Sequence, residues 1–287
     1  MKRSLFLFLT LLALASCRQV PVHPFLAQAQ NLYDLETGEP LSLRKAGQAA
    51  GVFGEWRDSL YGSPQAISFI RFNPDEYVIN VVSAQEEQAD STSALCARAN
   101  AVAGINGSYF DMQALTAETF IKDDGVDVSG TSPAETFRTN GLLLLNQEHI
   151  LIEESDTTQT EGDKWWECMA SGPILLDEGT SLTYSSESGF YQNRHPRSLI
   201  GMDADGYCWL VVVDGRADGE AAGMTIEELT HFAEGLGLTD ALNLDGGGSS
   251  TLWTLVAGVL NHPSDNGRFD HEGQRVVPNI LAIERAR

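Results

Sequence analysis

The sequence is short of cysteine and of positive charge. Only 4 of its 287 residues are cysteine, and no two form a Cys-x-x-Cys pair, which argues against a zinc ribbon. Lysine and arginine number 18 against 40 aspartates and glutamates, for a formal net charge of −22. Such a surface repels nucleic acid, so no nucleic-acid partner is expected. It also repels phosphorylated molecules at long range, so an anionic substrate would need a local arginine cluster.

The signature motifs of several catalytic classes are missing as well. The chain has no His-Glu-x-x-His, and its acidic runs lack the spacing of a calcium loop, so no metal site and no cofactor are predicted. Its glycine-rich run has neither the lysine of a P-loop nor the Gly-x-Ser-x-Gly of a serine hydrolase. A different kind of site is therefore expected.

One apolar run stands at the N terminus. Leu5–Leu14 follows two basic residues and is too short to span a bilayer comfortably, which is typical of a signal peptide. Small residues then precede Cys17, as in a bacterial lipobox, so we expect cleavage after residue 16 and a lipid anchor on Cys17. An ordinary signal peptide is the alternative. Because Arg18 rather than Asp follows the cysteine, the sequence predicts an outer-membrane lipoprotein, periplasmic or at the cell surface, that contacts the membrane only through this anchor.

The rest of the chain predicts a mixed α/β (α+β) fold, with a largely antiparallel sheet built from hairpins and a few packed helices. Residues 17–64 are interpreted as a tether and N-terminal extension, and 65–287 as the main domain, with its core starting at Ala66. Thr225 and Glu228 fit a capping box. The expected strands are 66–72 paired with 77–82, 101–105, 142–145 with 149–152, 174–176, 198–202 with 207–213, 241–244 and 279–283, and the helices are 91–100 and 225–236.

The strongest local signal is the glycine run after the strand at 241–244. Asp245 stands at the strand exit, Gly246, Gly247 and Gly248 let the backbone approach a ligand, and Ser249, Ser250 and Thr251 add hydroxyls. A tight polar turn is the alternative. The acidic residue before the glycines and the hydroxyls after them favour a phosphate or sugar site.

Two further segments carry acids and arginines to strand ends. Asp214-Gly215-Arg216 follows three valines, although a solvated strand end with a surface ion pair explains it equally well. Arg197 follows a proline, which presents it from a rigid position, and Arg275 is a second candidate for binding an anion.

Taken in order, these motifs resemble the phosphodiester glycosidase family over roughly residues 65–285. The resemblance implies that the substrate-binding and catalytic residues gather at one cleft. The motifs are Asn106-Gly-Ser-Tyr-Phe110, Ser171-Gly-Pro173, Pro196-Arg197, Asp214-Gly-Arg216, Leu244-Asp-Gly-Gly-Gly-Ser-Ser-Thr251, Asn261-x-Pro-Ser-Asp265 and Arg275-x-x-x-Asn279. The implied binding residues are Asn106, Gly246, Gly247, Ser249, Ser250, Arg216, Asp265, Arg275 and Asn279.

The chain departs from the family pattern near its end. The family often has Glu before the late arginine, where this chain has Gln274, and residues 266–273 look longer than usual. Asp270 and Glu272 are candidates to supply the missing carboxylate in space.

The expected activity is hydrolysis of a sugar linked through its anomeric oxygen to a phosphate. Asp245 is the first choice for the catalytic carboxylate and Asp214 the second, while Arg197 and Arg275 would stabilise the departing phosphate. His195 and His262 lie beside the motifs and are candidate general acids. The alternatives are a non-catalytic carbohydrate-binding lipoprotein and a metal-dependent phosphodiesterase. The expected partner is a phosphate-linked or phosphorylated glycan.

Overall fold

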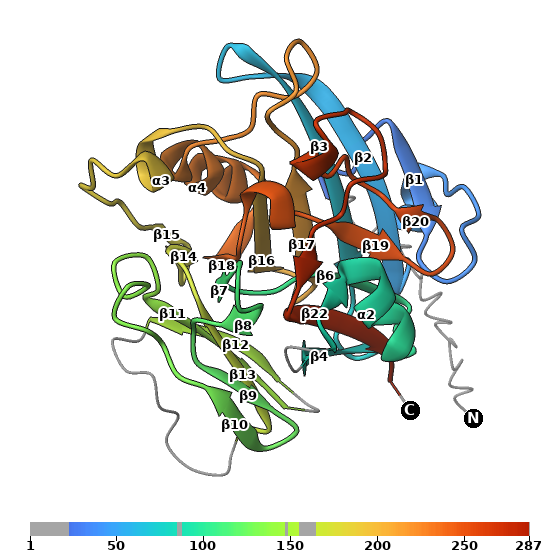
Figure 1. Ribbon diagram of the computed structural model, residues 1–287. Coiled ribbons are helices and arrows are strands. Elements are labelled where there is room, and N and C mark those ends of the chain that lie inside the picture. Colours follow the sequence, from blue (N-terminus) through green and yellow to red (C-terminus); the bar gives the residue numbers. More distant parts are fainter. Residues whose placement is uncertain (1–22, 85–87, 147–148, 155–164, 287) are drawn as a thin grey trace, which may run out of the picture.

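The computed structural model describes residues 23–84, 88–146, 149–154 and 165–286. The predicted signal peptide and Cys17 lie outside these ranges. Across the described residues strands predominate and helices are few and short, so the predicted mixed fold is confirmed (Figure 1).

The largest sheet has 8 strands in the order β1-β2-β3-β17-β16-β18-β14-β15. Each neighbouring pair in it is antiparallel. The strands are β1 (Asn31–Asp34), β2 (Gly51–Leu60), β3 (Ser63–Phe72), β14 (Ile174–Asp177), β15 (Thr180–Ser181), β16 (Arg197–Asp203), β17 (Cys208–Val213) and β18 (Leu238–Asn243). The two central strands, β16 and β17, form the predicted hairpin around Gly206, whose φ of +83° suits the turn.

Two 5-stranded sheets complete the framework, in the orders β20-β19-β6-β22-β4 and β10-β9-β13-β11-β12. The first contains β4 (Tyr77–Ser83), β6 (Ala103–Asn106), β19 (Leu252–Thr254), β20 (Gly258–Val259) and β22 (Asn279–Arg285). The second contains β9 (Ile121–Asp123), β10 (Val126–Ser129), β11 (Gly141–Leu145), β12 (Ile150–Glu154) and β13 (Glu167–Ser171). Short two-stranded ladders join β5 (Asp90–Ser91) to β21 (Val276–Val277), and β7 (Phe110–Asp111) to β8 (Thr116–Ala117).

The helices cover the sheets. α4 (Ile226–Gly235) begins at the predicted capping box, in which the Thr225 hydroxyl accepts from the Glu228 amide and the Glu228 carboxylate accepts from the Thr225 amide. Figure 1 shows α4 beside α3 (Gly189–Gln192) on one side of the large sheet. α2 (Thr92–Arg98) packs on β6, β19 and β22, and α1 (Leu43–Ala46) is a single turn after β1.

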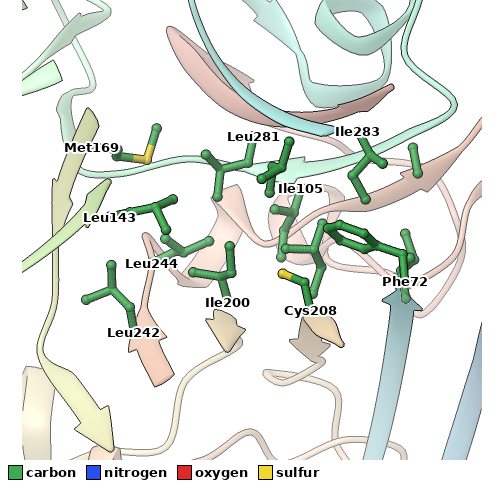
Figure 2. Packing of buried hydrophobic residues seen from close by; sticks show 14 of the residues in the cluster. Phe72, Ile105, Leu143, Met169, Ile200, Cys208, Leu242, Leu244, Leu281 and Ile283 are labelled. Carbon is green, nitrogen blue, oxygen red and sulfur yellow. The ribbon is translucent and has the colours of Figure 1, made fainter. Parts of the chain in front are cut away.

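The main core lies where the three large sheets meet. Figure 2 shows side chains of the 8-stranded sheet facing those of the two smaller sheets. The labelled residues are Phe72, Ile200, Cys208 and Leu242 of the large sheet, Ile105, Leu281 and Ile283 of the sheet around β6, Leu143 and Met169 of the sheet around β13, and Leu244 after β18. This packing fixes the ends of β6 and β18 beside one another. The Cys208 thiol is buried in this core.

Two predictions about the first half of the chain are wrong. Residues 66–72 and 77–82 do not pair with each other, because β3 is bonded on both sides, to β2 and β17, and β4 pairs with β22 in another sheet. The core does not start at Ala66 either. Leu26, Leu35 and Val52 are all fully buried, so strands from the expected extension belong to the large sheet.

Candidate active site

The glycine loop follows β18 and is held by one buried amide. Asn106, at the end of β6, donates from Nδ2 to the Asp245 carbonyl at 2.7 Å. Its Oδ1 accepts from the Thr251 amide at 3.1 Å and from the Ser198 hydroxyl at 2.8 Å. Asn106 is fully buried. Because it is bonded to Asp245 and to Thr251, it holds both ends of the glycine loop.

Asp245 stands at the entrance of this loop, half-buried. Its Oδ1 accepts from the Gly246 amide at 2.9 Å. Burial raises the pKa of the Asp245 carboxyl, and this effect is partly offset by the Ser249 hydroxyl and the Arg138 guanidinium. The carboxylate is therefore a stronger base than an ordinary aspartate.

The glycines are required because other groups press on the loop backbone. A Cβ on Gly247 would lie 2.9 Å from Nη2 of Arg216, and a Cβ on Gly248 would lie 1.7 Å from Oδ1 of Asp265. Gly247 also has a φ of +63°, which favours glycine. The groups that lie against the loop backbone in the structure are the side chains of Arg216 and Asp265. The approach of a ligand to this backbone stays a prediction.

Arg275 and Asp265 form a two-pronged ion pair over Gly248. Arg275 donates from Nε to Oδ2 of Asp265 at 2.7 Å and from Nη2 to Oδ1 at 2.8 Å. Its Nη1 donates to the Ser249 hydroxyl at 3.4 Å. Arg275 is therefore largely neutralised by a protein carboxylate, although its charge still lowers the pKa of Asp245.

Arg197, at the start of β16, is a buried cation with main-chain partners. Only 2% of it is exposed, and it donates from Nε to the Met224 carbonyl at 2.9 Å and from Nη2 to the Phe190 carbonyl at 2.6 Å. Within the described ranges no carboxylate lies at ion-pair distance from it. Burial lowers the pKa of Arg197 to about 10, so it remains charged at neutral pH. A Cβ on Gly246, the residue after Asp245, would lie 3.8 Å from Cα of Arg197, so the two predicted catalytic residues lie on the same side of the molecule.

Arg216 is exposed and lies against Gly247. Its φ of +61° places it in the left-handed region, which is unfavourable for a side chain other than glycine or asparagine. No described residue forms a hydrogen bond or ion pair with its guanidinium. Arg216 thus has an unfavourable backbone conformation and places its guanidinium against the glycine loop.

Asp214 follows β17, and protein donors occupy its carboxylate. Oδ1 accepts from the His262 amide at 2.9 Å and from Asn261 Nδ2 at 3.1 Å, and Oδ2 lies 2.8 Å from His262 Nδ1. On its other side, His262 Nε2 lies 3.2 Å from Nη2 of Arg57. This buried network ties the 261–265 loop to β17.

The two candidate histidines are poorly placed as general acids. His262 is held between Asp214 and Arg57 and stacks on Phe269 with 3.9 Å between ring centroids. Burial, together with Arg197 and Arg216, lowers the pKa of His195, which disfavours the protonated form that a general acid needs.

The residues that depart from the family pattern near the end of the chain form contacts within the protein or line another cavity. Gln274 accepts from the Ser93 amide at 3.0 Å and donates to the Ser93 hydroxyl at 2.9 Å, so it tethers the first turn of α2. Asp270 accepts from Asn266 and from the Glu272 amide within its own loop. Glu272 lines a separate cavity of about 550 Å³. Asp245 and Arg197 do not line this cavity.

Asn279, at the start of β22, also supports the loop that follows β6. Its Oδ1 accepts from the Ser108 amide at 2.6 Å. Its Nδ2 is buried and has no partner among the described residues, as is true of the Ser250 and Thr251 hydroxyls. Buried polar atoms of this kind usually bind water or a ligand.

Sequence reasoning missed an aromatic and cationic group beside Asp245. The guanidinium carbon of Arg138 lies 3.8 Å from the centroid of the Tyr109 ring and 5.1 Å from that of Phe190. The Tyr109 hydroxyl accepts from Asn243 Nδ2 at 3.0 Å, and the Phe190 ring centroid lies 5.0 Å from the guanidinium carbon of Arg197. Arg138 lies in an irregular segment that matches no motif, and its position directly before a buried strand is the only sequence signal.

Among the described residues, no group of three His, Cys, Asp or Glu side chains is placed to hold a metal ion. No helix in the same part of the chain is long and apolar enough to cross a bilayer.

Comparison with known proteins gives a consistent family match. The sequence profile of the phosphodiester glycosidase family matches residues 99–284. The N-acetylglucosamine-1-phosphodiester alpha-N-acetylglucosaminidases of mouse and human are 26% and 28% identical to the chain over 174 residues. These alignments cover 56% of this chain and 33% of each relative, so the chain spans about a third of the length of the relatives it matches.

Solved structures share the fold. The catalytic domain of the zebrafish N-acetylglucosamine-1-phosphodiester alpha-N-acetylglucosaminidase, auto-inhibited by its pro-peptide, superimposes with a TM-score of 0.65 at 16% identity, covering 82% of both chains. A hypothetical protein from Synechocystis gives a TM-score of 0.64 at 15% identity, covering 83% of this chain and 62% of the other.

Proposed function

Because the chain belongs to the phosphodiester glycosidase family, we propose that it hydrolyses a glycosyl phosphodiester at the bond between the anomeric carbon and the phosphate oxygen. The observation that supports this most strongly is Arg197, a buried guanidinium with no carboxylate partner among the described residues. Its Cα would lie 3.8 Å from a Cβ on Gly246, the residue after Asp245. A cation held in this way favours an anionic ligand.

The arginines would serve the phosphate in different ways. Arg216 is exposed and lies on the glycine loop, so it is the one best placed to contact a phosphate oxygen. Arg197 is buried, so it would stabilise the phosphate through its positive charge and not through direct contact. Arg275, already paired with Asp265, shapes the loop and contributes less to the ligand. The leaving phosphate monoester departs as an anion, so its charge is what must be stabilised.

Asp245 would act on the sugar side. Positive charge develops at the anomeric carbon as the bond to the phosphate oxygen breaks, and a carboxylate nearby stabilises it. Its raised pKa also suits it to accept a proton from the attacking water, whose oxygen forms the new bond to that carbon. Asp214, whose oxygens are engaged by Asn261 and His262, would position the 261–265 loop.

The cellular setting is part of the proposal. The N-terminal apolar run and Cys17 favour a lipoprotein of the outer membrane, facing the periplasm or the cell surface. A glycan carrying phosphate is the class of substrate that an envelope hydrolase of this family would meet.

The test is hydrolysis of N-acetylglucosamine-1-(methyl phosphate) in water enriched in oxygen-18. We expect the label in the sugar product, because the bond to carbon breaks. Label in the phosphate instead, with loss of activity in chelator, would identify a metal-dependent phosphodiesterase. Saturable binding of the ester without any product over long incubation would identify a carbohydrate-binding protein.

A further inference from the structure

A segment between β10 and β11 forms a wall that packs on Tyr109 through Arg138. The Tyr109 hydroxyl accepts from Asn243 Nδ2 at 3.0 Å, two residues before Asp245. Residues 131–140 are irregular but well tied down. The Ser132 hydroxyl donates to the Glu118 carboxylate, and Arg138 Nε donates to Glu135 Oε2 at 2.5 Å. The Tyr191 hydroxyl, on α3, donates to the Phe137 carbonyl at 3.0 Å. The segment is thus held by a bond within its own turn and by a bond from α3.

Arg138 is the inner residue of this wall. Its guanidinium carbon lies 3.8 Å from the centroid of the Tyr109 ring, and its side chain is 23% exposed. Burial opposes its charge, but the Glu135 carboxylate and the nearby Tyr109 and Asp245 raise the pKa of Arg138 above its ordinary value. Its charge is therefore permanent and is felt at Asp245.

Phe137 is the outer residue. Its ring is 52% exposed although its backbone is fixed by Tyr191. It meets the Phe190 ring edge to face, with 6.1 Å between centroids, and the Arg138 guanidinium carbon lies 5.4 Å from its own centroid. One face of a large apolar ring is thus offered to solvent next to a cation.

We propose that Phe137 and Arg138 bind the part of the substrate that lies beyond the anomeric carbon, and that Phe137 selects a ring-shaped leaving group. Arg138 contacts both the Tyr109 ring, which is bonded to Asn243 at the end of β18, and the Phe137 ring. A phosphate bound at Arg138 would therefore place its leaving group within reach of Phe137. The apolar face of a pyranose packs on an aromatic face, whereas a methyl group covers little of it. This inference rests on the proposed function and names Phe137 as a residue that determines specificity.

The experiment compares two esters of N-acetylglucosamine 1-phosphate, one with methyl and one with a hexose joined through its 6-oxygen. Phe137→Ala should lower kcat/KM for the hexosyl ester about tenfold, mainly through KM, and leave the methyl ester within about twofold. Arg138→Leu should lower both, because both carry the phosphate. Leu255→Ala, which alters a side chain that is 63% exposed at another place, is the control and should change neither.

An equal effect of Phe137→Ala on both esters, or no effect on either, would overturn the inference. A second measurement separates this outcome from failure of the proposed function. Titration calorimetry measures the Kd of a hexose 6-phosphate and of methyl phosphate without any turnover. The wild type should bind the hexose 6-phosphate more tightly, and Phe137→Ala should abolish this difference. Equal Kd ratios in the two proteins reject the role of Phe137 even if neither ester is hydrolysed.

Discussion

Asp214 and Asp245 occupy equivalent places in the sequence but have different hydrogen-bond partners in the structure. Each follows a buried strand and precedes a glycine. Asp214 accepts from three donors of Asn261 and His262, whereas Asp245 accepts from its neighbouring amide and the Ser249 hydroxyl and faces several guanidinium groups. Carboxylates at similar strand exits therefore have different uses, and the number of protein donors around each one separates a structural carboxylate from one left for substrate.

The largest expected effect comes from Asp245→Asn. Because the carboxylate would act on the developing positive charge, kcat should fall by about 10³-fold or more, on the order of 4 kcal/mol in activation free energy. The melting temperature should stay the same or rise, since burial already disfavours the charged form of this residue. Steady-state kinetics measure kcat, and calorimetric melting measures the melting temperature. Unchanged turnover would remove Asp245 from catalysis.

Asp214→Asn should have the opposite effect, with a large loss of stability and a small loss of activity. Replacing a buried, fully bonded carboxylate leaves the Asn261 and His262 donors short of an acceptor, so the free energy of unfolding should fall by about 3 kcal/mol. Activity per folded molecule should stay within about tenfold. Urea denaturation followed by fluorescence measures the first quantity. A stable variant without activity would make Asp214 the catalytic group and reverse the comparison.

Glu167 shows what burial does to the pKa of a carboxyl group. It is 9% exposed on β13, and burial raises its pKa to about 7, with the Val81 amide opposing the shift and Asp123 adding to it. Because the folded pKa lies above the unfolded one, the stabilisation from the protonated form is complete below about pH 4.5 and is lost as the pH rises through about 7.

Glu167→Gln should remove this loss, raising the free energy of unfolding relative to wild type by about 2 kcal/mol at pH 8 and by little at pH 5. Melting curves of both proteins from pH 5 to 8 supply the comparison, with Glu153→Gln, at an exposed position on β12 of the same sheet, as the control. A constant difference across the pH range would contradict the assignment.

The smallest effect concerns Arg216. Arg216→Gly removes a side chain from a left-handed backbone position, so the protein should gain about 1 kcal/mol of stability. It should lose about tenfold in kcat/KM, because a phosphate contact is gone. Glu178→Gly, at another positive φ of 45°, should give a similar gain without loss of activity. A stability gain with full activity would show that Arg216 does not contact substrate.

Much of the fold followed from local patterns. The β16–β17 hairpin and the capping box at Thr225 were predicted because their signals lie within a few residues of each other. The failed pairing of β3 with β4 shows the limit. A tight turn at 73–76 indicates where the chain reverses, but which neighbour a strand takes depends on β2, β17 and β22, which lie far away in the sequence.

The site was predicted in part. The order of motifs brought Asp245, Arg197 and the glycine loop together, and the coordinates place these residues close to one another. The partners of Asp214 could not be foreseen, because a strand exit does not reveal which loop returns to it. Arg138 and Phe137 were missed since they stand in an irregular segment whose position depends on Glu135 and Tyr191.

The place of β3 in the large sheet has a consequence for recombinant work. The family match begins at residue 99, yet six residues of β17 are hydrogen-bonded to β3. A fragment cut to the matched region would lose that partner and display a long apolar strand with unpaired amides and carbonyls. Exposed edges of this kind associate with one another, so such a fragment should precipitate where the chain from residue 23 remains dispersed.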